Sequence, residues 1–422
     1  MKTVAIHTLG CKLNFAESST IMRQFENAGY SIIDFDQKAD IFIIHSCIVT
    51  QQAERKCIST IRQAAKRNPK AQIAVLGCMP ELNKERLLEE NNKLLLLGNN
   101  QKFSVLEILS KGDTIIDNQS EIFQPSYSSG SRTRTFLKIQ DGCDYFCSYC
   151  TIPSARGNSR SANIEETIKY ICEATCNGCK ELVLTGINIG DFGKKHSESL
   201  LNLLIEIGKI DKIKRVRLSS IEPDLLSDEI IELFATSEKF MPHFHIPLQS
   251  ASDKILNLMH RKYTVDLFAS RVKKIKQKIP FACIATDIIC GFPNETEVDF
   301  DESFNFLKVQ PISYMHVFTF SERKGTQAYD MEYKVSSKIK KERSRKLHLL
   351  SDQKKMYFYS ENKNRICDAL FESENHNGEI FGFTDNYIKV KTNFDSELVN
   401  KIQRIKVLET NSSEICPIEL LK

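Results

Sequence analysis

Short apolar runs alternate with helical patterns along the N-terminal part of the chain. The runs that are typical of buried strands are Lys2–Leu9, Asp40–Cys47 and Ile73–Cys78. Between the first two lies Glu17–Tyr30, which has helical spacing and ends with a stop signal at Gly29. This alternation predicts a parallel sheet that is covered by helices.

A cysteine follows each of these three strand candidates. The three residues are Cys11, Cys47 and Cys78. The carboxyl ends of parallel strands meet at one edge of a sheet, and open α/β sheets bind their ligands there. We therefore expect the three thiols to share one edge, the alternative being three unrelated buried thiols.

A second alternation follows a polar segment, Phe123–Thr135, which we interpret as a linker because it is rich in Ser, Arg, Pro and Gly. Its strand candidates are Thr135–Gln140, Glu181–Gly186, Lys214–Ser220, Phe244–Gln249, Cys283–Gly291 and Met315–Phe320. Six strands in repeating βα order predict a partial (βα)6 barrel. The basic helical stretch Lys338–Ser360 closes this unit.

The last part of the chain changes character. Glu379–Thr392 and Lys401–Thr410 alternate apolar and polar residues and are separated by turn signals, which predicts a small antiparallel β-barrel. The expected division is an N-terminal α/β domain at 1–122, a central barrel at 132–360 and a C-terminal barrel at 361–422. The fold class is therefore α/β with a terminal all-β module.

Composition narrows the function classes only a little. Hydrophobic residues make up 41% of the 422 residues, which is enough for packed cores. The net charge of +4 permits a nucleic-acid partner without requiring one. The chain has no stretch of about 20 apolar residues, and its start lacks the apolar core of a signal peptide. We expect a cytoplasmic protein with no membrane partner.

The 14 cysteines carry more information. A reducing cytosol argues against disulfides, so clustered cysteines point to metal ligation. One cluster has the spacing C-x3-C-x2-C: Cys143, Cys147 and Cys150. Three thiolates on a [4Fe–4S] cluster leave one iron open to a small molecule. We expect Tyr145, Phe146 and Tyr149 to shield this cluster, and Arg156 and Arg160 to balance its charge.

The same spacing recurs at Cys172, Cys176 and Cys179. The first two lie four residues apart on a helical pattern that stops at Gly178, and the third begins a strand candidate. A regular helix does not wrap three thiols around a cluster as a loop does. We interpret this second set as small core residues.

The segment "DGCDYFCSYCTIPSARG", Asp141–Gly157, resembles the cluster loop of the radical S-adenosylmethionine (SAM) enzymes, and more narrowly that of the methylthiotransferases. The segments "TLGCKLN", "HSCIVT" and "VLGCMP" match the three cysteine sites of the N-terminal domain of this family. The resemblance covers essentially the whole chain. The C-terminal barrel is similar to the RNA-binding TRAM module of the same enzymes.

The resemblance implies two [4Fe–4S] clusters and two SAM molecules. Cys11, Cys47 and Cys78 would hold one cluster, and the catalytic Cys143, Cys147 and Cys150 would hold the other. One SAM would donate a methyl group to a sulfur on the N-terminal cluster, while the other would give the radical that activates C2 of adenine. Tyr149, Gly186, Asn188, Ser219 and Gln249 are the candidates for contacts to SAM.

The family has three main branches. They act on isopentenyladenosine in tRNA, on threonylcarbamoyladenosine in tRNA, and on an aspartate of a ribosomal protein. The start "GCKLN", with Lys12 and Leu13, is most similar to the second branch, since the first usually has "GCQMN" and the third "GCPKN". The implied activity is methylthiolation of C2 of N6-threonylcarbamoyladenosine at position 37 of tRNA, the other two substrates being alternatives.

Partners follow from the same resemblance: the anticodon loop of tRNA, and flavodoxin or ferredoxin as electron donor. Phosphate contacts are expected from Lys389, Lys391, Lys401, Arg404 and Lys406, and base stacking from Phe381, Phe383 and Tyr387, although at least one of the two phenylalanines is expected in the barrel core. A cysteine-rich module that binds metal and RNA without catalysis is the alternative class.

Two histidines alternate on one strand candidate, His243 and His245. Histidines on the same face of a strand can bind a metal. The sequence offers no third ligand nearby, so we expect a core or pocket-lining role instead.

Overall fold

The computed structural model describes residues 2–111, 122–128, 133–176, 178–412 and 414–421. Its first unit is a parallel sheet with the strand order β2-β1-β3-β4-β5. The strands are β1 (Thr3–Thr8), β2 (Ser31–Ile33), β3 (Ile41–Ser46), β4 (Gln72–Gly77) and β5 (Leu95–Leu97). The three expected strands are confirmed, and β2 and β5 extend the sheet on its two sides.

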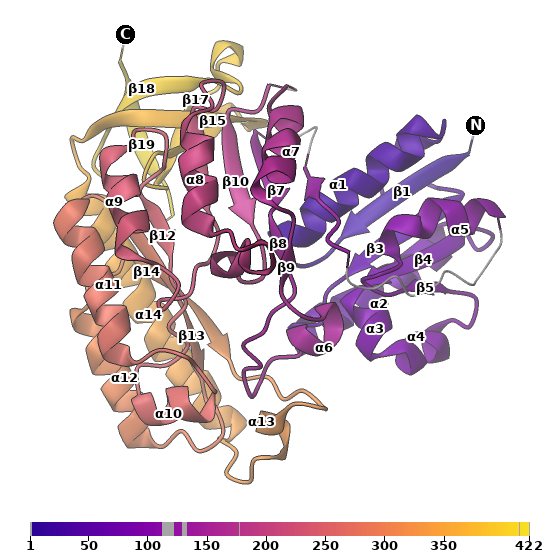
Figure 1. Ribbon diagram of the computed structural model, residues 1–422, viewed down its shortest axis with the longest axis horizontal. Helices are drawn as coiled ribbons and strands as arrows, with labels where there is room; N and C mark the ends of the chain where they lie inside the picture. Colours follow the sequence, from indigo (N-terminus) through magenta and orange to yellow (C-terminus); the bar gives the residue numbers. More distant parts are fainter. Residues whose placement is uncertain (1, 112–121, 129–132, 177, 413, 422) are drawn as a thin grey trace.

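Helices cover both faces of this sheet (Figure 1). They are α1 (Lys12–Asn27), α2 (Gln51–Arg67), α3 (Cys78–Leu82), α4 (Lys84–Glu90), the short η1 (Lys102–Ser104) and α5 (Val105–Lys111). Two apolar clusters, one on each face, bury the strands between these helices.

The central unit contains the six expected strands in parallel. They are β7 (Arg134–Lys138), β10 (Glu181–Thr185), β11 (Arg215–Leu218), β12 (His243–His245), β13 (Cys283–Cys290) and β14 (Tyr314–Thr319). The chain segments of β11 and β12 meet through two isolated parallel bridges at the ends of these strands, Val216–Phe240 and Ser220–His245. The predicted partial (βα)6 barrel is therefore confirmed.

The expected linker is partly structured. Within it, β6 (Ser126–Tyr127) pairs antiparallel with β7. Residues 129–132 of the same segment lie outside the described part of the chain. The polar composition concealed this strand, which is only two residues long.

The helices of the central unit lie on the outside of its strands, except two short ones, residues 152–156 and 327–330, which lie at the loop that carries Cys147 (Figure 1). The helices are α6 (Ile152–Arg156), α7 (Ile164–Cys176), α8 (Leu200–Gly208), α9 (Asp228–Thr236), α10 (Asp253–Leu258), α11 (Val265–Lys278), α12 (Glu297–Val309), α13 (Gln327–Asp330) and α14 (Ser337–Glu361). Side-chain hydroxyls cap several of them, and Thr296 forms a full capping box with Asp299 at α12. The basic stretch predicted as a helix is α14.

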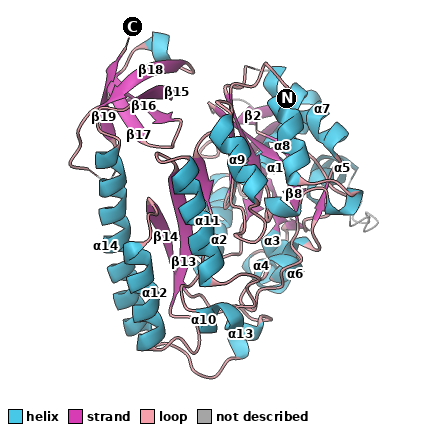
Figure 2. Cartoon of the chain, turned by 60° about the vertical axis from the view of Figure 1, so that its left-hand side comes forward, coloured by secondary structure: helices cyan, strands magenta, loops and turns pink. Residues whose placement is uncertain are grey.

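The C-terminal unit is a closed barrel with the strand order β15-β16-β17-β19-β18, seated above the end of α14 (Figure 2). Its strands are β15 (Ile366–His376), β16 (Glu379–Thr384), β17 (Lys389–Asn393), β18 (Ile402–Val407) and β19 (Cys416–Leu420). One pair, β17 with β19, is parallel, whereas the others are antiparallel as expected.

The C-terminal barrel docks on the amino ends of the central strands. Arg217 of β11 donates to the carbonyl oxygens of Thr384 and Asp385, at 2.8 Å each. Its guanidinium also pairs with the buried Glu181, the first residue of β10, at 2.6 Å. Tyr387, in the same turn between β16 and β17, packs on His243 with ring centroids 4.4 Å apart. This turn therefore closes the end of the barrel opposite the cysteines.

A buried charge cluster joins the first sheet to the central barrel. The carboxylate of Glu17 on α1 accepts from Lys138 of β7 at 2.6 Å and pairs with Lys102 at 2.7 Å and with Arg156 of α6 at 3.4 Å. Lys138 and Arg156 also pair with Asp141, at 2.7 and 2.9 Å. Burial acts to raise the pKa of Glu17, but the charges of Lys102, Lys138 and Arg156 hold it well below its usual value.

His45 lies next to this cluster, on β3, and is fully buried. Its Nδ1 is 2.9 Å from the Ser18 hydroxyl, and its Nε2 is 3.5 Å from Glu17. Burial lowers the pKa of His45 to about 3, against the opposing charge of Glu17. The folded protein therefore keeps this imidazole neutral at ordinary pH.

Glu17→Gln tests how much the cluster contributes. The substitution removes the anionic partner of several buried cations. We therefore expect the free energy of unfolding, for the first transition in guanidinium chloride titrations, to fall by about 3–5 kcal/mol. Glu165→Gln, which breaks an exposed pair with Lys169 on α7, serves as the control and leaves the transition in place. An unchanged transition in Glu17→Gln would contradict a joining role for the cluster.

His45 predicts an acid sensitivity with a definite window. As the pH falls below 6.5, the unfolded chain protonates His45, whereas the folded chain does so only near pH 3. Stability is therefore lost across this window, by at most about 1.4 kcal/mol per pH unit from this one group. Denaturant titrations at pH 7.5 and 5.5 should show a smaller loss for His45→Asn than for the unaltered protein. His348→Asn, at an exposed site on α14, should keep the original loss.

Candidate functional site

All six cysteines of the two sequence-predicted sets line one cavity of about 280 Å³. The cavity lies where the carboxyl ends of the first sheet face the loop that follows β7. Its lining also includes Asn14, Tyr145, Tyr149, Arg156, Gly186, Asn188, Glu222, Gln249 and Arg261. The structure thus brings together two sets of thiols that are far apart in the sequence.

The first three cysteines are held by the loops at the sheet edge. Asn14 donates to the carbonyl oxygens of Leu9 and Ser46, at 2.8 and 3.0 Å, and so ties together the loops that carry Cys11 and Cys47. Gly10 adopts a φ of +97°, and a Cβ there would lie 2.7 Å from the Cβ of Cys47. Only glycine fits this close approach.

Cys78 begins α3 and receives a hydrogen bond from outside its own loop. Asn99 Nδ2 lies 3.6 Å from the Cys78 sulfur and 2.6 Å from the carbonyl oxygen of Ala155. Ala155 belongs to α6 of the central unit, so this one amide joins a cysteine of the first sheet to the second cysteine loop.

The second cysteine loop is closed by a short antiparallel pair, β8 (Gln140–Asp141) with β9 (Arg160–Ser161). Within it, the Cys143 amide donates to the carbonyl oxygen of Gly157 at 3.1 Å. A Cβ on Gly142 would lie 2.0 Å from the carbonyl oxygen of Asn158, so this position also requires glycine. The Ile152 amide donates to the Cys150 sulfur at 3.4 Å.

The electrostatics of the thiols separate them into the same two sets. Burial raises the pKa of Cys47 to about 11, and negative charge on Cys11 or Cys78 would raise it further. Burial likewise raises the pKa of Cys150 to about 12, with Cys147 and Cys143 adding to it. Thiolates in such surroundings need a cation beside them. None of the cysteines, all of which lie in the described ranges, forms a disulfide.

Arg261, which the sequence analysis missed, is the cation that contacts Cys147. Its Nη1 donates to the Cys147 sulfur at 3.1 Å, and its Nη2 pairs with Glu222. Arg261 follows α10, more than a hundred residues from the loop, and lies in no motif that points to a site. Arg156 lines the cavity, whereas Arg160 pairs with Asp141 and donates to the carbonyl oxygen of Arg156. That the two arginines balance the charge of a cluster stays a prediction.

Two other expectations about the cysteine loops need correction. Phe146 is 59% exposed and does not shield the cavity, whereas Tyr145 and Tyr149 line it. Cys172 and Cys176 are exposed on α7 rather than buried in the core, and Cys179 is half-buried. Helical spacing placed these two on one face correctly, but it does not say which face is buried. Cys57 is fully buried in the first core.

Four of the five candidates for SAM contact line the cavity: Tyr149, Gly186, Asn188 and Gln249. Ser219 lies outside this lining, at the end of β11. Among the residues that the structure describes, neither the Asn188 side-chain oxygen nor the Ser219 hydroxyl has a hydrogen-bond partner, although both are buried. Buried polar atoms are rarely left unpaired, so these two are ready to contact a polar ligand.

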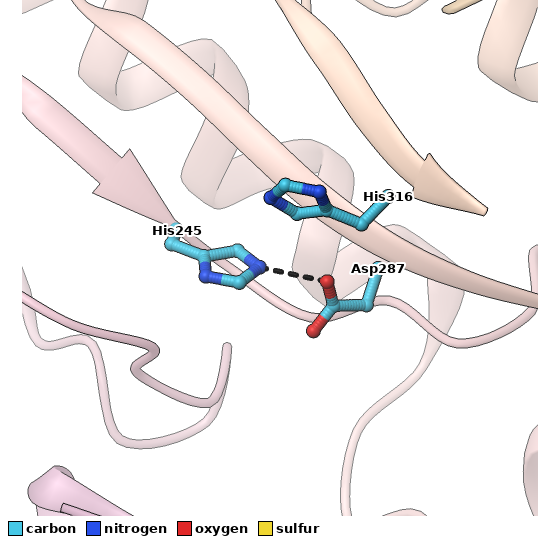
Figure 3. A group of neighbouring side chains, drawn as sticks. All are labelled: His245, Asp287 and His316. Atoms are coloured by element: carbon cyan, nitrogen blue, oxygen red, sulfur yellow. Dashed lines mark hydrogen bonds and ion pairs between the residues drawn. The ribbon is translucent and has the colours of Figure 1, made fainter. Parts of the chain in front are cut away.

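The two histidines of β12 have different surroundings. His243 is buried beside Tyr387, as a core residue is expected to be. His245 donates or accepts at Ser220 through Nδ1, at 2.9 Å, and pairs with Asp287 through Nε2, also at 2.9 Å. Its second neighbour is His316 of β14, and donor atoms of the three residues all lie within 4.8 Å of one another (Figure 3).

The residues expected to stack on RNA bases fall into two groups. Phe383 and Tyr387 stack on each other, and the guanidinium of Arg134 lies 4.4 Å from the Phe383 ring centroid, so both aromatics belong to the docking contact between the barrels. Phe381 stacks on His376, with Lys389 beside it, on the outer face of the C-terminal barrel. The expectation that one phenylalanine lies in the barrel core was wrong, because neither belongs to that core.

Comparison with known proteins identifies the family. Residues 3–98 match the model of the uncharacterized protein family UPF0004, and residues 137–307 match that of the radical SAM superfamily. The threonylcarbamoyladenosine tRNA methylthiotransferase MtaB of Bacillus subtilis is 37% identical over 97% of this chain and 94% of its own length. The chain belongs to the radical SAM methylthiotransferase family.

Other relatives of this family cover the chain almost completely. The MtaB of Aquifex aeolicus is 37% identical over 96% of this chain and all of its own length. The tRNA-2-methylthio-N(6)-dimethylallyladenosine synthase of Alkaliphilus oremlandii is 32% identical over 97% of this chain and 90% of its own length. Identity to the MtaB proteins therefore exceeds identity to the synthase, as the "GCKLN" start indicates.

Solved structures confirm the radical SAM fold. The radical SAM methyltransferase TsrM of Kitasatospora setae superimposes with a TM-score of 0.57 at 12% identity, covering 78% of this chain and 77% of TsrM. The cobalamin-dependent radical SAM enzyme OxsB gives a TM-score of 0.52 at 13% identity, over 78% of this chain and 55% of OxsB. None of the described helices is long and apolar enough to cross a membrane.

Membership of the radical SAM superfamily implies a [4Fe–4S] cluster and SAM. The donor set fits both groups. Cys143, Cys147 and Cys150 supply three thiols, two of which already accept N–H hydrogen bonds from Arg261 and Ile152. The unpartnered oxygen of Asn188 is a fitting acceptor for an amino group such as that of SAM.

Three cysteine substitutions test the two sets and the excluded one. Cys147→Ala removes one of three ligands, so we expect reductive cleavage of SAM to fall below detection. Cys47→Ala should lower the iron and sulfide content by about half and keep SAM cleavage. Cys176→Ala, on the exposed face of α7, should change neither quantity. Loss of iron in Cys176→Ala would contradict the exclusion of the second C-x3-C-x2-C set.

Proposed function

We propose that this protein methylthiolates C2 of N6-threonylcarbamoyladenosine at position 37 of tRNA. Two findings support this substrate. The relatives named MtaB are 34–38% identical to the chain, whereas the dimethylallyladenosine synthases are 29–32% identical. The chain also carries Lys12 and Leu13, which are typical of the threonylcarbamoyladenosine branch.

The observation that carries the reaction is the pair of cysteine sets around one cavity. We assign a second [4Fe–4S] cluster to Cys11, Cys47 and Cys78, and the SAM-cleaving cluster to Cys143, Cys147 and Cys150. With three thiolates each, both clusters keep one open iron. The corresponding division of the chain is 1–122, 132–360 and 361–422, so the cavity lies between the first two domains.

When bound, these groups supply a methyl-bearing sulfur and a radical derived from SAM, which C2 of adenine needs because its C–H bond does not respond to acids or bases. The residues of the chain do the rest. Arg261 donates a hydrogen bond to the Cys147 sulfur, and its ion pair with Glu222 fixes the position of the guanidinium. Asn188 is turned by its donation to Asp191 at 3.0 Å, which leaves its oxygen free for a ligand. Tyr149 and Gln249 complete the proposed SAM contacts, with Gly186 leaving room beside them.

We assign tRNA binding to the C-terminal barrel. The outer face around Phe381, His376 and Lys389 offers one stacking surface with a cation beside it. The proposed contact is the anticodon loop, and the proposed electron donor is flavodoxin or ferredoxin. We place the enzyme in the cytoplasm, where its substrate is found.

Mass spectrometry of tRNA nucleosides tests the proposal. A strain without this protein should lack 2-methylthio-N6-threonylcarbamoyladenosine and accumulate its precursor. Restoring the gene should return the product, whereas the Cys47→Ala and Cys147→Ala genes should not.

Other outcomes assign the chain to another branch. Loss of methylthio-isopentenyladenosine alone would replace the proposed substrate while keeping the chemistry. If neither nucleoside changed, the methylthiolated aspartate of the ribosomal protein would be measured next.

A further inference from the structure

A polar group stands on three adjacent strands inside the central barrel: His245 on β12, Asp287 on β13 and His316 on β14. Asp287 and His316 are directly opposite each other in the parallel register. The rings of His245 and His316 have centroids 5.3 Å apart. All three side chains point to the same side of these strands (Figure 3). None of the steps assigned above to the cysteines, Arg261 or the SAM contacts uses this group.

The group borders the cysteine cavity. The amide of Gln249, whose side chain lines that cavity, donates to the carbonyl oxygen of Asp287 at 2.7 Å. Glu222, also in the lining, has a pKa raised by burial, and the charge of Asp287 is among the further causes. The histidines and Asp287 therefore stand one residue beyond the cavity wall, on the side toward the docked C-terminal barrel.

The group contains one carboxylate, Asp287, and the charges of two lysines act on it from outside. Burial lowers the pKa of His316, and the charges of His245, Lys12 and Lys355 lower it further, while Asp287 opposes them. Lys12 comes from the other domain and follows Cys11 directly. Three donor atoms within 4.8 Å of one another could hold a metal. His245, however, already uses both ring nitrogens on Ser220 and Asp287, which leaves the exposed His316 ring to contact a ligand. An imidazole N–H and a lysine ammonium are both donors, so His316 and Lys12 together suit an anionic ligand.

The proposed substrate carries an anionic group that these donors can bind. The appendage on N6 of threonylcarbamoyladenosine ends in a carboxylate, whereas an isopentenyl appendage is wholly apolar. C2 and C6 of adenine both neighbour N1, so a base whose C2 lies among the cysteines must project its N6 appendage into the adjacent region. The adjacent region includes His245, Asp287, His316 and Lys12.

We propose that His316 and Lys12 bind the carboxylate of the threonyl appendage, and that Ser220 and Asp287, which occupy both ring nitrogens of His245, hold that ring against His316. These are positioning and specificity residues, since they contact the part of the substrate that does not react. The inference rests on the proposed function and adds the basis of its selectivity. An apolar appendage would displace water from these half-buried and exposed polar groups without offering them a partner.

The experiment compares two RNAs on the reconstituted enzyme. Both are anticodon stem-loops with threonylcarbamoyladenosine, and in one the threonyl carboxylate is a methyl ester. The unaltered enzyme should prefer the free acid by about tenfold to a hundredfold in kcat/KM, the value of one charged hydrogen bond. The preference should appear in KM, and equally in the Kd measured by fluorescence anisotropy without SAM.

Two variants probe the protein side of the contact. Lys12→Gln and His316→Gln should each reduce the preference for the acid, chiefly by weakening binding of the acid and not of the ester. His316→Gln is the cleaner test because, unlike Lys12, His316 does not adjoin one of the six cavity cysteines in the sequence, and iron content and SAM cleavage should stay unchanged in it. His348→Gln, on the exposed face of α14, should keep the full preference.

Four results would overturn the inference. If the unaltered enzyme has the same kcat/KM for the acid and the ester, the threonyl carboxylate makes no contact with the protein. If His316→Gln weakens the binding of the acid RNA and of the ester RNA equally, the residue has only a structural role. Tight binding of Zn²⁺ to the unaltered protein that disappears in His316→Gln assigns the group to a metal. If neither RNA is methylthiolated but an isopentenyladenosine stem-loop is, the proposed substrate itself fails and the inference fails with it.

Discussion

The buried carboxylate of Glu17 is the interaction on which the arrangement of the site depends. Glu17 belongs to the helix that begins just after Cys11, whereas Lys138 and Arg156 belong to the segments on either side of the second cysteine loop. Burying so many charges is costly unless each one is paired, so the cluster accepts only one relative position of the two domains. That position turns the two sets of thiols toward each other. Asn14 extends the same constraint to Arg156, which donates to its side-chain oxygen at 2.6 Å.

Much of the fold could be predicted because it depends on local patterns. The three long strands of the first sheet and the six central strands are apolar runs bounded by turn signals, and parallel pairing puts the residues after them at one edge. The position of Cys11, Cys47 and Cys78 therefore followed from the sequence. The three-residue strands β2 and β5 are too short to give a pattern of their own.

The features that could not be predicted from the sequence depend on contacts between distant segments. Arg261 reaches Cys147 across 114 positions of the chain, and nothing in its own neighbourhood marks it. The exposure of Cys172 and Cys176 is decided by which face of α7 packs on the barrel, and cysteine is apolar enough to be placed on either face. The docking of Tyr387 on His243 joins residues of different domains, so the apparent RNA-stacking residue proved to be part of an internal contact.

The docking of the C-terminal barrel also limits how RNA can be handled. Arg217 and Arg215 hold the β16–β17 turn by its backbone carbonyl groups, and Arg365 pairs with Asp385 of that turn at 2.6 Å. An RNA seated on this barrel would thus be held at a fixed reach from the cysteine cavity, with no hinge between the two. The nucleic acid would have to make the adjustment, by swinging the target base out of its stack. The enzyme would then select one nucleotide of a loop by its distance from the docked barrel as well as by its chemistry.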